Sequence, residues 1–384
     1  MQKILIIHNK YRIFGGEDSN IIDEIEILKK EFQIDYLEFD NSKKLKFLNV
    51  VYFFFSNNIS SNRLLNNKLK TFQPDFVYVH NTWFTANLGI FNILQKNNVK
   101  TFLKIHNFRY ECSRYFLSKN HMKNSTQCPM CGYNRKGFLN KYFTESYIKS
   151  FFMILYGKKY FKILLNNNLT ILVLNKFHFE KMIEYGISEE KVTITHNPVL
   201  IKKQKINIYD PNSNYIVYAG ALSDSKGIHQ LIDTFDSIQD NNLTLKVVGD
   251  GPLKDILDSS QNKKIEYIGV LDNFKTLELI SNSRAVVTFT KMYEGQPRLL
   301  NEASALGIPS IYPDFGGITE YFPSNYKLSF KQFDYLNAKE KFLLLNDLNL
   351  LKLLSKQVAS FASENLSEEI ILNNYKKVFD DCKK

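Results

Sequence analysis

The sequence has little of several features that define common protein classes. It contains no run of about 18 apolar, uncharged residues, and a transmembrane helix needs such a run. The apolar segment Met1–Ile7 is too short for a signal peptide, and His8, Asn9 and Lys10 follow it too soon. We therefore expect a cytoplasmic protein.

Cysteine is also scarce. Four cysteines in 384 residues do not suggest a disulfide framework, and a reducing compartment favours thiol or metal roles. Cys112, Cys128 and Cys131 form the pattern C-x15-C-x2-C, with His106 and His121 close in sequence. Three thiolates and one imidazole would make a closed structural zinc site, and free buried thiols are the alternative. The zinc content of the purified protein distinguishes the two.

The positive charge is concentrated in one segment. The formal net charge is +11, and the segment from Lys100 to Leu165 holds thirteen Lys or Arg residues against Glu111 and Glu145. Such a segment can face anionic lipid, a phosphorylated substrate, nucleic acid or only water. No nucleic-acid motif accompanies the charge, so we expect no nucleic-acid partner. A helix with several lysines at 147–165 either lies on an anionic membrane surface or packs in the core.

Strand-like and helix-like segments alternate in two series. The first series has predicted strands at 3–7, 75–79, 101–105 and 169–174, and predicted helices at 21–30, 86–95, 147–165 and 176–184. The second series has predicted strands at 215–218, 243–248, 265–268 and 285–288, and predicted helices at 231–237, 253–258, 274–281 and 298–306. Such alternation is typical of a parallel sheet with helices on both faces.

The two series predict an α/β protein with two domains, which the chain length and 44% hydrophobic content can support. We expect a Rossmann-like domain over 1–198, with a cysteine-containing basic insertion at about 106–165. A polar linker, 199–214, precedes a second Rossmann-like domain over 215–366, and 367–384 form a final helix.

Glycines follow several predicted strands, where doubly wound sheets bind their ligands. Gly15 and Gly16 come after the first strand, and Gly249 follows a strand of the second series. The loop GALSDSKGIHQLI places Lys226 just before a helix, where a cation and helix amides can hold an anion. A glycine pair after a strand is also a common turn, so a purely structural interpretation remains open.

Two glutamates lie eight positions apart in the second half. Glu294 precedes the predicted helix 298–306, and Glu302 falls in its second turn. Carboxylates accept hydrogen bonds from sugar hydroxyls, although a capping acid and a solvated helix residue would give the same pattern. A second loop-to-helix junction with the sequence GGITE begins at Gly316 and favours a binding site.

These motifs together resemble the family 4 retaining glycosyltransferases of the GT-B fold, of the type that builds bacterial cell-surface polysaccharides. The second half carries GALSDSKGIHQLI, VVGDGP, EGQPRLLNEASALGIPSI and GGITE. The first half carries GGEDSNIIDEIEILKKEF, PDFVYVHNTWF and FLKIHNFRYEC, which resemble the acceptor-side domain of bacterial members. The resemblance covers nearly the whole chain. It implies two Rossmann-like domains facing across a cleft, with the final helix crossing back to the first domain.

The resemblance also implies an activity and its residues. The donor would be a UDP- or GDP-linked sugar, and the acceptor a glycan or lipid-linked molecule. His106 would lie beside the reacting sugar, and Glu294 would bind the donor sugar. The implied donor-binding residues are Gly15, Gly16, Lys226, Gly249, Gly295, Arg298 and Glu302. The family requires no metal, so fixed cations and helix ends would stabilise the departing diphosphate, and no cofactor is expected.

The chain departs from the family pattern at two places. The family usually has an arginine where this chain has Ala221, and that arginine is a second cation for the diphosphate. Pro297 replaces a glycine in the loop after Glu294 and removes one amide donor. We predict that Arg298, at the start of the next helix, supplies the missing positive charge.

Two other functions remain open at this point. One is a nucleotide-sugar epimerase of the GT-B fold, and the other is a non-catalytic module that binds nucleotide or nucleic acid. The basic first domain also fits a lipid-linked acceptor, which would place the protein peripherally on the inner face of a membrane.

Overall fold

The computed structural model describes residues 1–11, 15–41, 47–107, 146–166, 169–201, 208–238, 242–258 and 262–380. These residues divide into two compact units. The first unit contains the described residues up to 198 and those from 371 onward, and the second contains those from 199 to 370. Each unit holds one six-stranded sheet.

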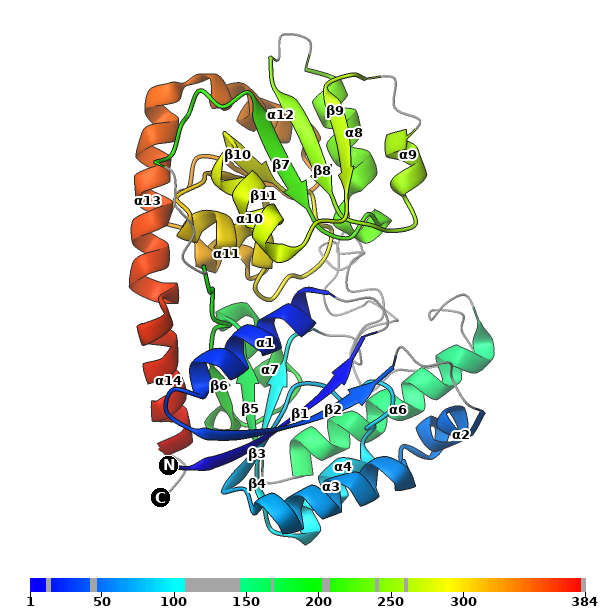
Figure 1. The fold of residues 1–384 in the computed structure, drawn as a ribbon. Helices are drawn as coiled ribbons and strands as arrows, with labels where there is room; N and C mark the ends of the chain where they lie inside the picture. Colours follow the sequence, from blue (N-terminus) through cyan, green and yellow to red (C-terminus); the bar gives the residue numbers. More distant parts are fainter. Residues whose placement is uncertain are drawn as a thin grey trace. The chain divides into compact units, whose positions relative to one another are not determined.

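The first unit is built on a parallel sheet with the strand order β2-β1-β3-β4-β5-β6 (Figure 1). Its strands are β1 (Lys3–Lys10), β2 (Gln33–Asp40), β3 (Phe76–Val79), β4 (Lys100–Ile105), β5 (Leu169–Val173) and β6 (Val192–Ile194). Its helices are α1 (Gly16–Leu28), α2 (Phe47–Phe55), α3 (Ile59–Phe72), α4 (Gly89–Lys96), α6 (Tyr147–Asn166), α7 (Lys176–Glu184) and the short η1 (Glu189–Lys191). Residues 4–7 of β1 are fully buried because helices cover both faces of the sheet.

The carboxyl-terminal helix α14 (Glu368–Asp380) contributes its residues from 371 onward to the first unit. Ile371, Tyr375 and Phe379 are buried at a spacing of four residues, which is one face of a helix. The Phe379 ring lies 4.7 Å from the ring of Phe76 and 4.9 Å from that of Phe102, between ring centroids. The helix therefore completes the hydrophobic core beside β3 and β4.

Helix α6 confirms the helix predicted at 147–165 and has two kinds of surface. One face is buried and includes Met153, Tyr156 and Tyr160, so the helix packs in the core of the first unit. Near its amino end, Tyr147 and Ile148 are exposed. Among the described helices, none combines the length and the apolar character needed to cross a membrane.

The second unit has the strand order β12-β11-β10-β7-β8-β9, and its strands also pair in parallel. Its strands are β7 (Tyr215–Ala219), β8 (Thr244–Val248), β9 (Ile265–Gly269), β10 (Ala285–Val287), β11 (Ser310–Asp314) and β12 (Ser329–Lys331). Its helices are η2 (Asp224–Lys226), α8 (Ile228–Asp236), α9 (Lys254–Asp258), α10 (Asn273–Ser281), α11 (Arg298–Ala305), η3 (Ile318–Tyr321), α12 (Tyr335–Leu343), η4 (Leu344–Asn346) and α13 (Leu348–Leu366). Figure 1 shows α13 as the long orange helix of this unit.

The predicted strands and helices are all present, with ends shifted by a few residues. The sequence analysis did not predict β2, β6, β11 and β12, nor the helices α2, α3, α12 and α13.

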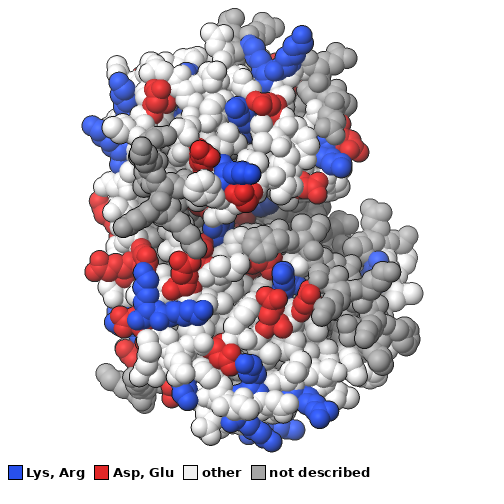
Figure 2. All heavy atoms as spheres, viewed as in Figure 1, with Lys and Arg blue, Asp and Glu red and all other residues white. Residues whose placement is uncertain are grey.

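Charges of both signs are interspersed on the face seen in Figure 2. Seven of the thirteen basic residues of the segment 100–165 fall between 109 and 141, outside the described residues.

The packing of Phe379 predicts a large effect of its truncation. Phe379→Ala should lower the free energy of unfolding of the first unit by about 3–5 kcal/mol, because it leaves a cavity against β3 and β4. Urea unfolding followed by the fluorescence of Trp83, the single tryptophan of the chain, measures this unit. Phe274→Ala, at an exposed phenylalanine of the second unit, is the control. Equal stabilities of Phe379→Ala and the wild type would contradict the role given to α14.

Candidate functional site

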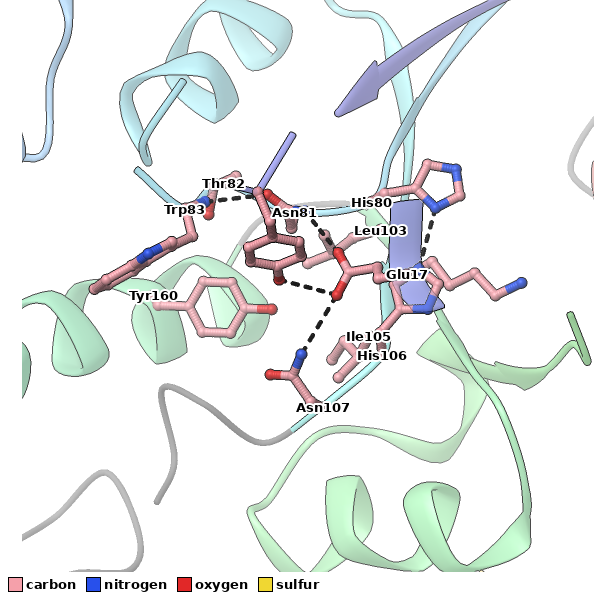
Figure 3. A pocket seen from close by; sticks show the side chains of 12 residues that line it. Glu17, His80, Asn81, Thr82, Trp83, Leu103, Ile105, His106, Asn107 and Tyr160 are labelled. Atoms are coloured by element: carbon pink, nitrogen blue, oxygen red, sulfur yellow. Dashed lines mark hydrogen bonds between the residues drawn. The ribbon is translucent and has the colours of Figure 1, made fainter. Parts of the chain in front are cut away.

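A pocket opens in the first unit where β3 and β4 end (Figure 3). Parallel strands bring their carboxyl ends to one edge of the sheet, so the loops that follow them converge there. The lining residues come from the loops after β1, β3 and β4, from the last residues of β4, from the first turn of α1, and from α6. They are Tyr11, Glu17, His80, Asn81, Thr82, Trp83, Leu103, Lys104, Ile105, His106, Asn107 and Tyr160.

Glu17 lies at the centre of this pocket in Figure 3. The Tyr11 hydroxyl donates to its Oε2 at 2.9 Å, and the Asn81 side-chain amide donates to its Oε1 at 2.6 Å. The Asn107 amide approaches Oε2 at 3.5 Å. Three neutral donors from three loops therefore hold one carboxylate in a fixed place.

The start of α1 positions Glu17. Asp18, the third helical residue, accepts the Gly15 N–H at 3.0 Å and so caps the helix. Asp18 also contacts His8 Nε2 at 2.9 Å. Burial raises the pKa of Asp18, but the hydrogen bonds from His8, Gly15 and Tyr11 outweigh it and lower the pKa below its ordinary value. Gly16 is exposed, with open space where a Cβ would be.

His106, predicted to lie beside the reacting sugar, lines the pocket and pairs with His80. His80 Nδ1 and His106 Nε2 are 3.1 Å apart, and the rings stack with an interplanar angle of 21°. Burial, followed by nearby positive groups that include Lys104, lowers the pKa of both histidines well below the ordinary value. Both rings are therefore neutral at physiological pH, and one donates a hydrogen bond to the other.

A buried polar cluster lies behind the histidines and was missed by the sequence analysis. Glu24 of α1 accepts from Lys104 Nζ at 3.1 Å and from the Tyr78 hydroxyl at 2.6 Å. The Tyr375 hydroxyl of α14 contacts both Glu24 and Lys104. Burial lowers the pKa of Lys104, although Glu24 opposes the shift. The sequence signal for this cluster was the lone lysine inside the apolar strand FLKI, because a buried charge must be paired with another polar group.

In the second unit, Lys226 and Glu294 form an ion pair. Lys226 ends η2 in the loop after β7, and Glu294 lies in the loop after β10. Lys226 Nζ is 2.5 Å from Glu294 Oε1, and the Thr290 hydroxyl donates to the same oxygen at 2.7 Å. The pair is partly buried, so the structure brings together a cation and a carboxylate that lie 68 residues apart.

The second glutamate of the predicted pair, Glu302, forms an ion pair with Arg298. Arg298 Nε is 2.6 Å from Glu302 Oε1, one helical turn apart on α11, and both side chains are mostly buried. The guanidinium predicted to compensate for Ala221 therefore already contacts a carboxylate. Its role toward a diphosphate stays a prediction.

The loop after β8 contains glycines at positions where the structure leaves no room for a side chain. Gly249 has φ of 137°, and a Cβ there would lie 1.9 Å from the carbonyl oxygen of Gly220 in the loop after β7. A Cβ at Gly251 would lie 2.3 Å from the carbonyl oxygen of Leu222. The two loops approach each other too closely for a side chain, so glycine is required at both positions whether or not a ligand binds there. Gly295 is buried between Glu294 and Gln296.

Of the predicted zinc ligands, only His106 lies in the described residues. Cys112, Cys128, Cys131 and His121 lie outside the described residues. Within the described ranges, no group of three or more His, Cys, Asp or Glu side chains is arranged to hold a metal ion.

Known proteins resemble this chain in part of its sequence and in its whole fold. Residues 201–358 match the family model described as glycosyl transferases group 1. A stretch of 115 residues is 33% identical to TuaC of Bacillus subtilis (strain 168), named for a glycosyltransferase of teichuronic acid biosynthesis. That stretch covers 30% of this chain and only 28% of TuaC.

Solved structures match over the full length. HepE of Anabaena, solved in complex with UDP and glucose, has a TM-score of 0.72 and 13% identity, covering 99% of this chain and 100% of that chain. Sucrose-phosphate synthase from Thermosynechococcus elongatus has a TM-score of 0.70 and 12% identity, and the match covers 100% of this chain and 99% of that chain. The predicted fold is thus confirmed: two Rossmann-like α/β units of the GT-B fold.

The buried His178 of α7 predicts a pH dependence of stability. Burial lowers its pKa from 6.5 to about 3, so between these pH values the unfolded chain binds one proton more than the folded chain. The folded state therefore loses about 1.4 kcal/mol per pH unit from this residue as the pH falls below about 6.5. His178→Leu should reduce the pH slope of the unfolding free energy by that amount. Urea unfolding at pH 6.5, 5.5 and 4.5 measures it, and an unchanged slope would contradict the assignment.

Proposed function

We propose that this protein is a family 4 retaining glycosyltransferase that moves a sugar from a nucleotide diphosphate sugar to a glycan or lipid-linked acceptor. The observation that carries the proposal is the Lys226–Glu294 pair, which joins the loops after β7 and β10. Both residues lie within the part of the chain that matches the group 1 glycosyl transferases. UDP is the favoured nucleotide because HepE, of the same fold, was solved with UDP and with UDP-glucose.

Lys226 and the amides of the neighbouring helix ends would bind the diphosphate. A diphosphate carries more negative charge than one carboxylate, so it would compete with Glu294 for the Lys226 ammonium. Glu294 would then be released to accept hydroxyls of the donor sugar. Glu302 would hold the ribose hydroxyls, and Gly249 and Gly295 would let the backbone approach the nucleotide.

In the proposed reaction, the bond between the anomeric carbon and the diphosphate oxygen breaks. The acceptor oxygen forms its bond to the same face of that carbon, and its proton passes to the departing phosphate. Lys226 stabilises the charge that develops on the leaving group. No residue of the protein is required as nucleophile, and the anomeric configuration is retained.

From the first unit, Gly15 and Gly16 would let the backbone approach the phosphates. His106 would contact the reacting sugar. Because its pKa is well below the ordinary value, the ring would act as a neutral hydrogen-bonding group rather than as an acid. His80, 3.1 Å away, would set its tautomer.

Attachment to the inner face of an anionic membrane is part of the proposal. Exposed Tyr147 and Ile148 begin α6, and the exposed Phe55 ends α2. Lys149 lies beside the first two, and such a mixture of apolar and basic groups suits a membrane surface. A lipid-linked acceptor would then be within reach of a protein that acts from the cytoplasm in surface polysaccharide synthesis.

Removal of the Lys226 ammonium should abolish most of the activity. Lys226→Met should lower kcat/KM for the nucleotide sugar about 100-fold, because one fixed cation facing the leaving group is lost. Lys275→Met, at an exposed lysine of the same unit, is the matched control. Activity is measured by product formation across a panel of UDP- and GDP-sugars, and NMR of the product reports the anomeric configuration.

Other results would contradict the proposal. In a thermal-shift assay, stabilisation of the protein by polyanions but not by UDP or GDP would indicate a nucleic-acid-binding module. Conversion of the nucleotide sugar into its epimer without transfer would indicate an epimerase. An inverted product would overturn the retaining assignment alone.

Arg298 provides a separate test of the diphosphate site. Arg298→Ala should weaken donor binding about tenfold if the guanidinium turns from Glu302 to the diphosphate, since a charged hydrogen bond is lost. Arg298→Lys, which keeps the charge, should recover part of the binding. Unchanged turnover and unchanged donor affinity in Arg298→Ala would show that it does not compensate for Ala221.

A further inference from the structure

The hydrogen bond between His80 and His106 can form in two ways. It joins His80 Nδ1 and His106 Nε2, which are 3.1 Å apart (Figure 3). A hydrogen bond between two ring nitrogens needs one N–H and one bare nitrogen. Either His80 donates from Nδ1, and the ring proton of His106 is then on Nδ1, or His106 donates from Nε2. Because His106 lines the pocket, the two arrangements offer different groups to a ligand.

The carboxylate of Glu24 favours donation by His80. Its Oε2 lies 3.8 Å from His80 Nδ1, and both side chains are fully buried. The three donors that hold this carboxylate, from Lys104, Tyr78 and Tyr375, all contact Oε1. Oε2 has no hydrogen-bond partner in the described part of the chain. The distance of 3.8 Å is too long for a hydrogen bond, but the negative charge attracts an N–H at Nδ1 and repels a lone pair there, strongly so in a buried site.

The other ring nitrogen of His80 favours the same arrangement. Among the described residues, nothing forms a hydrogen bond with His80 Nε2, which is buried. If His106 were the donor, the ring proton of His80 would be on Nε2, as a buried N–H without an acceptor. Such orphaned donors are rarer in proteins than acceptors without a donor. Donation from Nδ1 leaves Nε2 as a bare acceptor, which is the smaller cost.

We propose that Glu24 is a positioning residue that acts through His80: its charge keeps a proton on His80 Nδ1, His80 donates a hydrogen bond to His106 Nε2, and His106 carries its own ring proton on Nδ1. The consequence for catalysis rests on the proposed glycosyltransferase function. In that reaction His106 meets the sugar as a hydrogen-bond donor, because its Nε2 lone pair is already used. His106 is then not the base that takes the acceptor proton, which passes to the departing phosphate.

NMR of the full chain without substrate tests the two tautomers directly. In protein made with isotope-labelled histidine, long-range proton–nitrogen correlation spectra distinguish a ring nitrogen that carries hydrogen from a bare one. The variants His80→Gln and His106→Gln assign the signals, since each lacks one ring. At neutral pH both rings should carry hydrogen on Nδ1, and His106 should be bare at Nε2. A bare Nδ1 on either ring would overturn the proposal.

Glu24→Gln keeps the size of the side chain and removes its charge. It should shift the tautomer ratio of both rings at least about tenfold toward hydrogen on Nε2. The double variant Glu24→Gln/Lys104→Met removes both charges of the buried ion pair, so that no lysine is left unpaired, and should give the same shift. Tyr375→Phe is the matched control, because it removes a donor from Oε1 and keeps the Glu24 charge. It should leave the tautomers unchanged.

Wild-type tautomers in both Glu24 variants would show that Glu24 does not position the histidines. Kinetics test the consequence for catalysis: Glu24→Gln should lower kcat about tenfold with little change in KM for the donor, because one hydrogen bond to the reacting sugar is lost. An unchanged kcat with shifted tautomers would refute that consequence. The tautomers are measured without substrate, so a protein with the predicted tautomers and no transferase activity would remove the proposed function and leave the role of Glu24 supported.

Discussion

All pairs of described strands in both units are parallel, and this constraint determines where chemistry can occur. In a parallel sheet the carboxyl ends of all strands lie at the same edge. Residues distant in sequence therefore meet in the loops that follow these ends. In the first unit this brings Glu17, Asn81 and His106 to one pocket. In the second unit it brings Lys226 to Glu294. Polar side chains gather there because the strands themselves are buried on both faces.

The polar groups of the first unit form two layers. The inner layer is the cluster of Glu24, Tyr78, Lys104 and Tyr375, which ties α1, β3, β4 and α14 together. Loss of one partner would leave a charge buried without compensation, so the cluster makes the position of α14 specific rather than merely apolar. The outer layer is the pocket with His80, His106 and Glu17. Lys104 links the two layers, because it bonds to Glu24 and also lines the pocket.

The sequence predicted the two alternating series, the fold and the loops that carry polar residues, since each depends on local periodicity and on glycines after strands. It did not predict the partners of those residues. Lys226 and Glu294 lie 68 residues apart, and no local rule joins them. Arg298 and Glu302 sit one helical turn apart, a spacing that permits the ion pair observed. Gly249 was predicted to bind the donor, and the structure adds a second reason for this glycine that no local pattern shows, the close approach of the Gly220 carbonyl. Lys104 and Tyr375 could be paired only once α14 was placed in the first unit.

The central claim is that the loops after β7 and β10 bind the diphosphate of a nucleotide sugar. Hydrogen–deuterium exchange of the intact protein, with and without saturating UDP, tests it most directly because it reports each loop separately. The account predicts slower amide exchange at residues 220–228 and 291–298, and little change in the exposed first turn of helix α10. Protection confined to other segments, or no protection at saturating UDP, would contradict it.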